Sequence, residues 1–440
     1  MRRTGKLLAA LLLIGAGFGW GVATQAFHVF PYQLLRDLRS ALRSGPEEPI
    51  GRWHELRSAG DDDLEENLAG HPYLRGYQEA RERSGAFVRD RERVCPGLTL
   101  FTSGHAPTIL LVDIDGEVVH EWRTGVDEVW PDGLDFKVHP AYRSYIRRGH
   151  PFPNGDILAI FEYIGVARLA RDGKPIWGLA NQAHHDVAVF PDGTLVTLVR
   201  RYRSPDELSA AHPGIPFVGE VKDDRVAFVS STGEELRSFS LLDALLASDY
   251  ASLLGRFPRL HGDLLHANSV DIVGPAIAAR YPFADEGDVL VSVRSLDSVV
   301  VLDGKTGRVR WVATGQWRAQ HQAQFLANGN ILLFDNRGAH RGGLGDPVRS
   351  RAVEFDLLTR EIVWQYAGRD LHSHSLGSVR RLPNGNTLIT ESTQGRILEV
   401  TPDGKLVWEY VSPHRTGKND RLIATIMGAR RIDPGMLTFR

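Results

Sequence analysis

From Leu98 onward the 440-residue sequence alternates two short repeated units, and this repetition limits the architectures that the chain can adopt. The first unit is a hairpin with a turn that contains Gly or Asp, followed by an aromatic residue. Its copies end at Trp122, Trp177, Phe239, Trp311, Trp364 and Trp408. The second unit is a strand, a Gly-containing turn and a strand: PFPNGDILAIF, VFPDGTLVTLV, FLANGNILLF, RLPNGNTLIT and a degenerate EGDVLVSV. One copy of each unit makes a four-stranded antiparallel sheet.

Six aromatic hairpins predict six such sheets, and repeated sheets of this kind are typical of an all-β protein, the β-propeller. We therefore predict a six-bladed propeller over residues 96–413, with a C-terminal tail over 414–440. A seventh blade would require strands from the preceding segment. The aromatic residues would be packing wedges between blades. The long spacing between Phe239 and Trp311 accommodates insertions, including the helical-looking LLDALLASDYASLLGRF.

The N-terminus predicts a membrane anchor. Residues 7–27 form an uncharged, largely apolar run behind Arg2, Arg3 and Lys6, long enough to span a bilayer with its basic flank in the cytoplasm. A cleaved signal peptide is the alternative, but ATQA fits its small-x-small exit site poorly. Residues 1–27 are thus expected to be a cytoplasmic tip and single-pass inner-membrane anchor, and residues 28–95 a helical stalk or collar. The propeller would lie in the periplasm.

Charge and cysteine content exclude some classes of function. A formal net charge of −2 gives no electrostatic reason for a nucleic-acid partner. The single cysteine, Cys95, forms no intrachain disulfide or cysteine metal site, and we expect it to be a small buried residue.

Histidines recur at one position of the second unit. His185 lies six residues before Pro191, and His321 lies six residues before Ala327. His266 opens HANSVDI, and we assign it to the same register with an insertion before the turn. These positions start the innermost strands of three blades, so their side chains should meet at one mouth of the channel.

The far ends of the following strands return to that mouth, at Glu162, Arg200, Arg294, Asn336 and Ser392. We expect a funnel of His185, His266, His321 and Arg294, with Asn268 on the same face. Two other blades carry Arg147 and Gly377 at the histidine position. If the histidines had a scaffold role that every blade needs, these two blades would be expected to carry histidine as well.

Two chemistries suit this cluster. Three histidines with an open position are typical of a zinc site. Alternatively, an arginine, a neutral nucleophilic histidine and an amide donor suit transfer of an anionic group such as phosphoryl or sulfuryl. No GxxxxGK[ST] loop is present, so a nucleotide donor is not indicated. No carboxylate occupies an obvious position behind the histidines, although Asp186 and Asp271 are near in sequence.

Several ordered motifs resemble the bacterial arylsulfate sulfotransferase family from about Pro96 to Pro413. They are PGLTLFTSGHAPTILLVDIDGEVVHEW, HHDVAVFPDG, LHANSVDIV, GDVLVSVRS and QHQAQFLANGNILLFDNRG. The resemblance implies a periplasmic six-bladed propeller that moves a sulfuryl group from a phenolic sulfate ester to a phenolic acceptor. It also implies a transiently sulfated histidine, ping-pong kinetics, no adenosine-based donor, and neither metal nor cofactor.

Position by position, the resemblance implies that His321 is sulfated and that His266 and Asn268 bind sulfuryl oxygens and assist proton transfer. Arg294 would clamp the sulfate, and His185 would be the remaining pocket histidine. Further substrate contacts are expected from His184, Arg200 and Asn336.

The chain departs from the family in three respects. It cannot form the disulfide of well-known members, its N-terminal region differs, and Gly377 with nearby His372 and His374 alters one side of the pocket. A membrane-tethered member could use a lipid, quinone or glycan acceptor. The alternatives are a membrane-tethered, non-catalytic propeller that serves as a binding or assembly module, and a zinc hydrolase using the three histidines.

Overall fold

The computed structural model describes residues 80–337, 349–368, 370–416 and 418–438. The chain divides into two compact units, Met1–Pro49 and Ile50–Arg440, and every described residue belongs to the second. The predicted membrane span and most of the predicted stalk lie outside the described residues. Within the described ranges, no helix is both long and apolar enough to cross a membrane.

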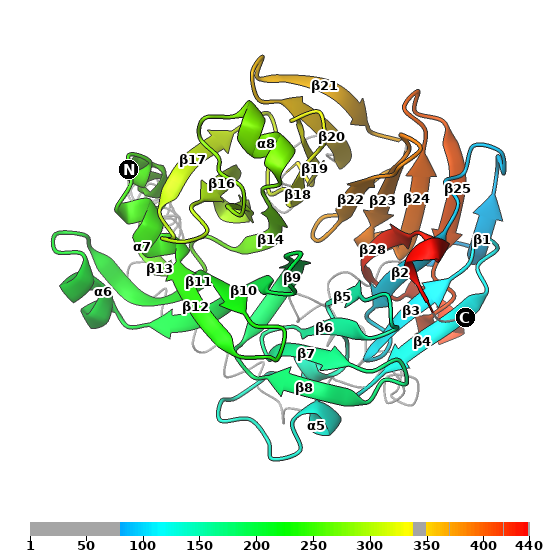
Figure 1. The fold of residues 1–440 in the computed structure, drawn as a ribbon, viewed down its shortest axis with the longest axis horizontal. Coiled ribbons are helices and arrows are strands. Elements are labelled where there is room, and N and C mark those ends of the chain that lie inside the picture. Colours follow the sequence, from blue (N-terminus) through cyan, green and yellow to red (C-terminus); the bar gives the residue numbers. More distant parts are fainter. Residues whose placement is uncertain (1–79, 338–348, 369, 417, 439–440) are drawn as a thin grey trace, which may run out of the picture. The chain divides into compact units, whose positions relative to one another are not determined.

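The predicted six-bladed propeller is confirmed: six antiparallel sheets surround a central axis (Figure 1). Each blade is named here by its innermost strand. From the inside outward, three blades consist of β28 (Ile426–Ile432), β2 (Leu98–Ser103), β3 (Thr108–Val112) and β4 (Val118–Arg123); β5 (Arg148–Pro151), β6 (Ile157–Phe161), β7 (Gly165–Leu169) and β8 (Pro175–Leu179); and β9 (Ala183–Val189), β10 (Leu195–Arg203), β11 (Phe217–Val229) and β12 (Glu235–Ser240).

The other three blades follow the same plan. They consist of β14 (Ala267–Ile272), β15 (Val289–Val293), β16 (Ser298–Leu302) and β17 (Val309–Thr314); β18 (His321–Phe325), β19 (Ile331–Asp335), β20 (Arg351–Asp356) and β21 (Glu361–Tyr366); and β22 (Ser378–Arg381), β23 (Thr387–Glu391), β24 (Arg396–Val400) and β25 (Leu406–Val411).

The C-terminal segment closes the ring, so the predicted tail over 414–440 is wrong. Its strand β28 pairs with β2 from Leu98↔Ile432 to Ser103↔Ile426 and forms the innermost strand of that blade. The two ends of the propeller domain thus share one sheet, in which β28 covers the inner edge of β2. The sequence repeat did not reveal this strand because no Gly turn joins it to β2.

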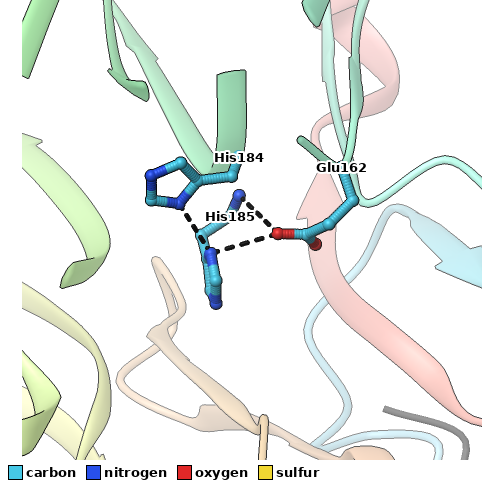
Figure 2. Close-up of side chains that lie close together, drawn as sticks. All are labelled: Glu162, His184 and His185. Carbon is cyan, nitrogen blue, oxygen red and sulfur yellow. Dashed lines mark hydrogen bonds and ion pairs between the residues drawn. The ribbon is translucent and has the colours of Figure 1, made fainter. Parts of the chain in front are cut away.

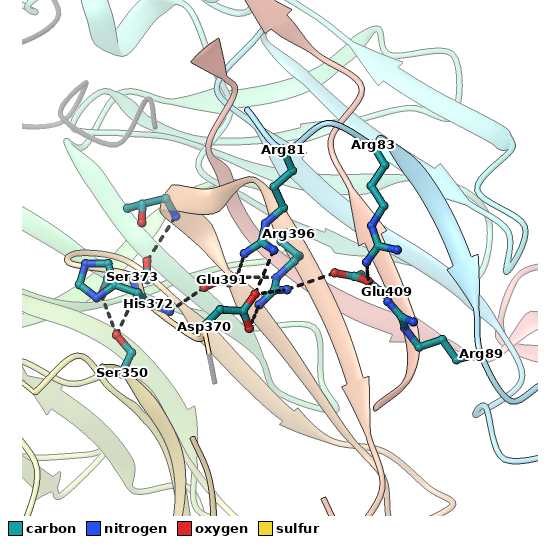
Figure 3. A network of polar contacts seen from close by, with 11 residues as sticks. Arg81, Arg83, Arg89, Ser350, Asp370, His372, Ser373, Glu391, Arg396 and Glu409 are labelled. Carbon is teal, nitrogen blue, oxygen red and sulfur yellow. Dashed lines mark hydrogen bonds and ion pairs between the residues drawn. The ribbon is translucent and has the colours of Figure 1, made fainter. Parts of the chain in front are cut away.

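The described part of the predicted helical stalk contains a strand. β1 (Gly85–Val88) pairs with β25, from Gly85↔Val411 to Val88↔Trp408, as a fifth strand of the β22 blade. Ala86 and Val88 pack against the core, so the segment follows a period of two despite its charged flanks. Figure 3 shows Arg83 and Arg89 on either side of this strand, each 2.7 Å from the buried Glu409 carboxylate.

Helices occur in the connections. The predicted helical insertion forms α7 (Leu241–Leu246) and the 3₁₀ helix η3 (Ala251–Arg256), and α7 packs on β11 and β12. The remaining short elements are α5 (Val126–Val129), α6 (Pro205–Ala211), α8 (Pro275–Arg280), β13 (Leu260–Gly262), β26 (Arg415–Thr416), β27 (Leu422–Ile423) and the 3₁₀ helices η2 (Pro140–Arg143), η4 (Arg294–Leu296), η5 (Ser392–Gln394), η6 (Lys418–Asp420) and η7 (Pro434–Met436).

Tryptophans of the outer strands join neighbouring blades. The indole N–H of Trp122, in β4, donates to the carbonyl of Gly155 in the next blade at 2.9 Å. That of Trp408, in β25, donates to Ile114 at 2.7 Å. Both side chains are fully buried. The predicted wedge role is therefore confirmed at these two positions. Cys95 is a buried free thiol, as expected.

Removal of one wedge should weaken the ring. We expect Trp122→Ala to lower the free energy of unfolding by about 3–5 kcal/mol, because a large buried ring is lost and a cavity remains. Trp122→Phe keeps most of the ring and should cost less. Urea denaturation of both variants checks this, and equal, small effects would contradict the wedge role.

Candidate active site

Four inner strands begin with an interrupted pairing register, three of them in the blades that carry the predicted histidines. The shift falls between Thr197 and Leu198 in the β9 blade, between Ala267 and Ser269 in the β14 blade, and between His321 and Gln324 in the β18 blade. The inner pairs β5–β6 and β22–β23 show no shift along their paired residues. Bulges redirect side chains and are frequent beside functional sites. Three of the four shifts lie in the blades that carry the predicted histidines, and the fourth, between Thr102 and Ser103, lies in the β28 blade.

The turns after these strands give a common reference. A backbone hydrogen bond of 2.8 Å closes each turn, and its N–H donors are Phe190, Val273 and Leu326. Five residues before them lie His185, Asn268 and His321. The predicted register of His266 is therefore wrong by two residues, and Asn268 occupies the equivalent position. The insertion that contains α8 conceals the turn in the sequence.

His266 nevertheless reaches the same mouth. Its ring centroid lies 5.4 Å from that of His185, with the rings nearly perpendicular. Its carbonyl accepts a hydrogen bond from the backbone N–H of Arg294 at 3.3 Å. Burial, followed by the charges of Arg294, His185 and His266, lowers the pKa of His321 well below its usual value. The structure thus brings these four predicted residues together.

The ring of His321 is held in one tautomer. Asn336 donates both amide hydrogens, to the carbonyls of Ser373 at 2.7 Å and Leu376 at 2.8 Å. Its Oδ1 must therefore accept from His321 Nδ1, at 2.7 Å. The lone pair of the neutral imidazole is then on Nε2. Because its pKa is lowered, His321 is neutral at physiological pH and can act as a nucleophile.

His184 and His185 form a buried chain of polar contacts with Glu162 (Figure 2). His184 Nδ1 and His185 Nδ1 are 2.8 Å apart, and His185 Nδ1 is 3.1 Å from Glu162 Oε1. Since a carboxylate only accepts, His185 carries the proton on Nδ1, and His184 Nδ1 accepts. His184 Nε2 then faces Asp224 at 3.4 Å.

Burial lowers the pKa of His185 to about 3, although Glu162 opposes this effect. Burial raises the pKa of Glu162, but His185 and Arg147 together lower it to about 2. The Arg147 Nε atom lies 2.8 Å from Glu162 Oε2. At neutral pH this group is therefore a neutral His185 beside an ion pair.

The ligand atoms of Glu162, His184 and His185 lie within 4.8 Å of one another, a spacing that could hold a metal ion. Among the described residues this group meets that spacing, whereas the predicted trio His185, His266 and His321 does not. Arg147 already neutralises Glu162, so a divalent cation would add uncompensated charge to a buried site. The residues fit a proton-sharing chain better than a metal site.

His266 has a partner that the sequence analysis missed. Its Nδ1 lies 2.8 Å from Asp263 Oδ2, three residues earlier in the loop before β14. The sequence signal for this contact was the acidic residue in HGDLLHANS. The carboxylates that the sequence analysis considered as partners of the histidines were instead Asp186 and Asp271. Asp186 instead contacts Arg148, and Asp271 accepts from the N–H of Phe325.

The predicted substrate contacts divide into two groups. Asn268 Nδ2 donates to the carbonyl of Gln320 at 2.8 Å, which places the amide beside His321. Arg200 lies 3.4 Å from the ring centroid of Tyr163 and donates to the Tyr202 hydroxyl. By contrast, Asn336 Oδ1 accepts from His321 Nδ1, and His184 Nδ1 lies 2.8 Å from His185 Nδ1. We interpret these two as groups that orient His321 and His185.

A polar layer of side chains from three inner strands lies next to this site. Arg148 Nε lies 3.1 Å from Asp186, and its Nη2 donates to Gln322 Oε1 at 2.6 Å. Gln322 in turn donates to Asp186 at 3.0 Å. A Cβ at Gly428 would lie 1.9 Å from Arg148 Nη1, so any other residue there would displace this guanidinium. The closed triangle spans the β5, β9 and β18 blades.

Beyond this layer, His150 should make stability depend on pH. Burial, then the charges of Arg430 and Arg380, lowers its pKa to about 3 from 6.5. The unfolded chain therefore binds a proton between these values and the folded chain does not, so stability falls as pH falls below 6.5. We expect His150→Gln, which can still accept from Arg430, to lose less unfolding free energy between about pH 7 and about pH 4.5. Urea denaturation at both pH values checks this. An equal loss of unfolding free energy in the wild-type protein and in His150→Gln would contradict it.

The family model described as arylsulfotransferase (ASST) matches residues 153–413, more than half of the chain and all of the predicted site residues. No curated protein matches the sequence.

Similar solved structures include a protein of unknown function from Bacteroides caccae, with 15% identity and a TM-score of 0.45, covering 72% of this chain and 93% of that one. They also include a streptogramin B lyase, with 11% identity and a TM-score of 0.43, covering 81% and 97%. These TM-scores are too low to support an argument. The family assignment depends on the sequence match across five blades, and by that match the chain belongs to the arylsulfotransferase family.

Proposed function

We propose that the protein transfers a sulfuryl group from an aryl sulfate ester to a phenolic acceptor through a sulfated His321. The observation that carries the proposal is the state of His321: its Nδ1–H is donated to Asn336, which leaves the Nε2 lone pair for attack. Membership of the arylsulfotransferase family supports a sulfotransferase-type enzyme.

In the first half-reaction, His321 Nε2 attacks sulfur and the bond from sulfur to the phenolic oxygen breaks. Arg294 and the second amide hydrogen of Asn268 would hold the sulfuryl oxygens while negative charge moves to the leaving phenolate. His266 or His185 would supply the proton that the phenolate needs.

In the second half-reaction, the incoming phenol loses its proton to the same histidine, and its oxygen attacks the sulfur on His321. The sulfur–nitrogen bond breaks and its electron pair returns to Nε2. The two substrates use the same pocket in turn, so the kinetics should be ping-pong. No metal or cofactor takes part in these steps.

The cellular setting belongs to the same proposal. Residues 7–27 would anchor the protein in the inner membrane, with the propeller on the periplasmic side. A phenol is the simplest acceptor, and an anchored enzyme also has access to lipid or glycan acceptors.

A non-catalytic binding propeller was the alternative. It would be favoured by an insertion that blocks the channel mouth or by histidines that stay apart. The second condition is not met, because the ring centroids of His185 and His266 lie 5.4 Å apart. No observation in the described residues favours that alternative.

The test uses the purified full-length protein with 4-nitrophenyl sulfate and phenol. We expect nitrophenolate release that depends on the acceptor, formation of phenyl sulfate, and parallel double-reciprocal plots. Absence of release across a broad set of aryl sulfates and phenols, from folded protein, would refute the proposed function.

A further inference from the structure

The three pocket histidines differ in the group that holds Nδ1. His321 donates to a neutral amide. His185 donates to a carboxylate that Arg147 already neutralises. His266 lies against the carboxylate of Asp263. An amide gives little support to an imidazolium ion, whereas an adjacent carboxylate stabilises one and fixes the tautomer. The three rings are therefore suited to different steps.

We propose that Asp263 is a positioning residue that makes His266, and not His185, the group that exchanges a proton with the phenolic oxygen. The inference rests on the proposed sulfuryl transfer and assigns a step that this proposal left open between two histidines. Asp263 acts through His266 and does not touch substrate.

The contact between Asp263 and His266 has the required geometry. Oδ2 and Nδ1 are 2.8 Å apart, and because the carboxylate accepts, Nδ1 carries the hydrogen. Burial raises the pKa of Asp263, but contact with His266, together with Lys222 and Arg200, holds it well below its usual range. The carboxylate is thus ionised and His266 presents Nε2 to its surroundings, with His185 as a neighbour.

Exposure also separates the two candidates. The side chains of His266 and Asp263 are 16% and 26% exposed, whereas those of His185 and Glu162 are 3% and 2% exposed. A group that gains and loses a proton in each turnover must hold a charge, and charge is costly in a fully buried site. His266 meets this requirement, and buried His185 does not.

The proton balance of the reaction follows. Protonated His266 gives its Nε2 hydrogen to the phenolic oxygen as the S–O bond breaks, so the phenol leaves neutral. His266 is then neutral with the hydrogen on Nδ1 retained by Asp263. The incoming phenol returns a proton to Nε2 as its oxygen bonds to sulfur and the S–N bond to His321 breaks. The cycle ends with His266 protonated and His321 neutral.

The experiment compares two donors with Asp263→Asn in the full-length protein. 4-Nitrophenolate leaves readily without a proton, whereas phenolate leaves far more slowly. Loss of general-acid support should therefore reduce the single-turnover rate with phenyl sulfate by about 10²-fold and change that with 4-nitrophenyl sulfate much less. Asp263→Glu should restore part of the loss, and Asp249→Asn, at an exposed aspartate, serves as the matched control.

A uniform loss with both donors, or no loss with either, would overturn the inference, because a merely structural role does not depend on the leaving group. If Asp263→Asn does not fold, Asp263→Ser provides the same comparison. Failure of the proposed function itself is distinguishable, since the wild-type protein would then release no phenol from either donor.

Discussion

Replacing His321 by Ala should abolish sulfuryl transfer, with a loss of at least about 10⁴-fold in kcat, because no other group supplies the attacking electron pair. The side chain is almost fully buried, and its Nδ1 contacts Asn336, so loss of the ring leaves Asn336 Oδ1 without its donor. We expect the burst of nitrophenolate to disappear as well. Stopped-flow absorbance with 4-nitrophenyl sulfate measures both effects.

Two comparisons separate chemistry from folding. His120 lies on the outermost strand β4, where its Nε2–H donates to the backbone carbonyl of Arg171, so His120→Ala should keep wild-type activity. His321→Gly with added imidazole should regain part of the nitrophenolate release, since free imidazole can occupy the vacated space and attack sulfur. Wild-type activity in His321→Ala would contradict the assignment of the nucleophile.

Removing residues 414–440 should unfold the propeller. If these residues were a tail, as the sequence predicts, the propeller would tolerate their removal, but β28 is the innermost strand of a blade and pairs with β2. Ile423, Ile426 and Ile432 are buried, and each is worth roughly 1.5–3 kcal/mol. A loss of about 5–9 kcal/mol is comparable with the total stability of a typical domain.

The truncated chain should therefore show no cooperative thermal transition by circular dichroism, and it should aggregate through the exposed edge of β2. A variant that ends at Asp433 retains β28 and removes the segment that contains η7. We expect this control to unfold cooperatively, with a smaller decrease in Tm. A folded, cooperative 1–413 chain would contradict the closure by β28.

Much of the fold was predictable because each blade repeats the same local pattern. Gly-containing turns with alternating apolar residues specify hairpins, and six copies specify six blades. The exceptions are segments whose partner is distant in sequence. β28 finds β2 only when the ring closes, and β1 becomes a strand only because β25 offers a free edge.

The candidate site was predictable to the extent that it follows the repeat. His185 and His321 share the expected position, and Glu162, Arg294 and Asn336 lie at the predicted strand ends. The alignment failed at His266, since the inserted α8 hides the turn from which the register must be counted.

Local periodicity and ordered motifs were enough to predict the propeller, the blades that carry the pocket residues and membership of the arylsulfotransferase family. The partner of each histidine became known from the folded chain: Asn336 for His321, Glu162 for His185 and Asp263 for His266. The difference has a physical reason. Hairpin formation depends on residues a few positions apart, whereas tautomer and charge depend on burial and on atoms that different strands bring within about 3 Å.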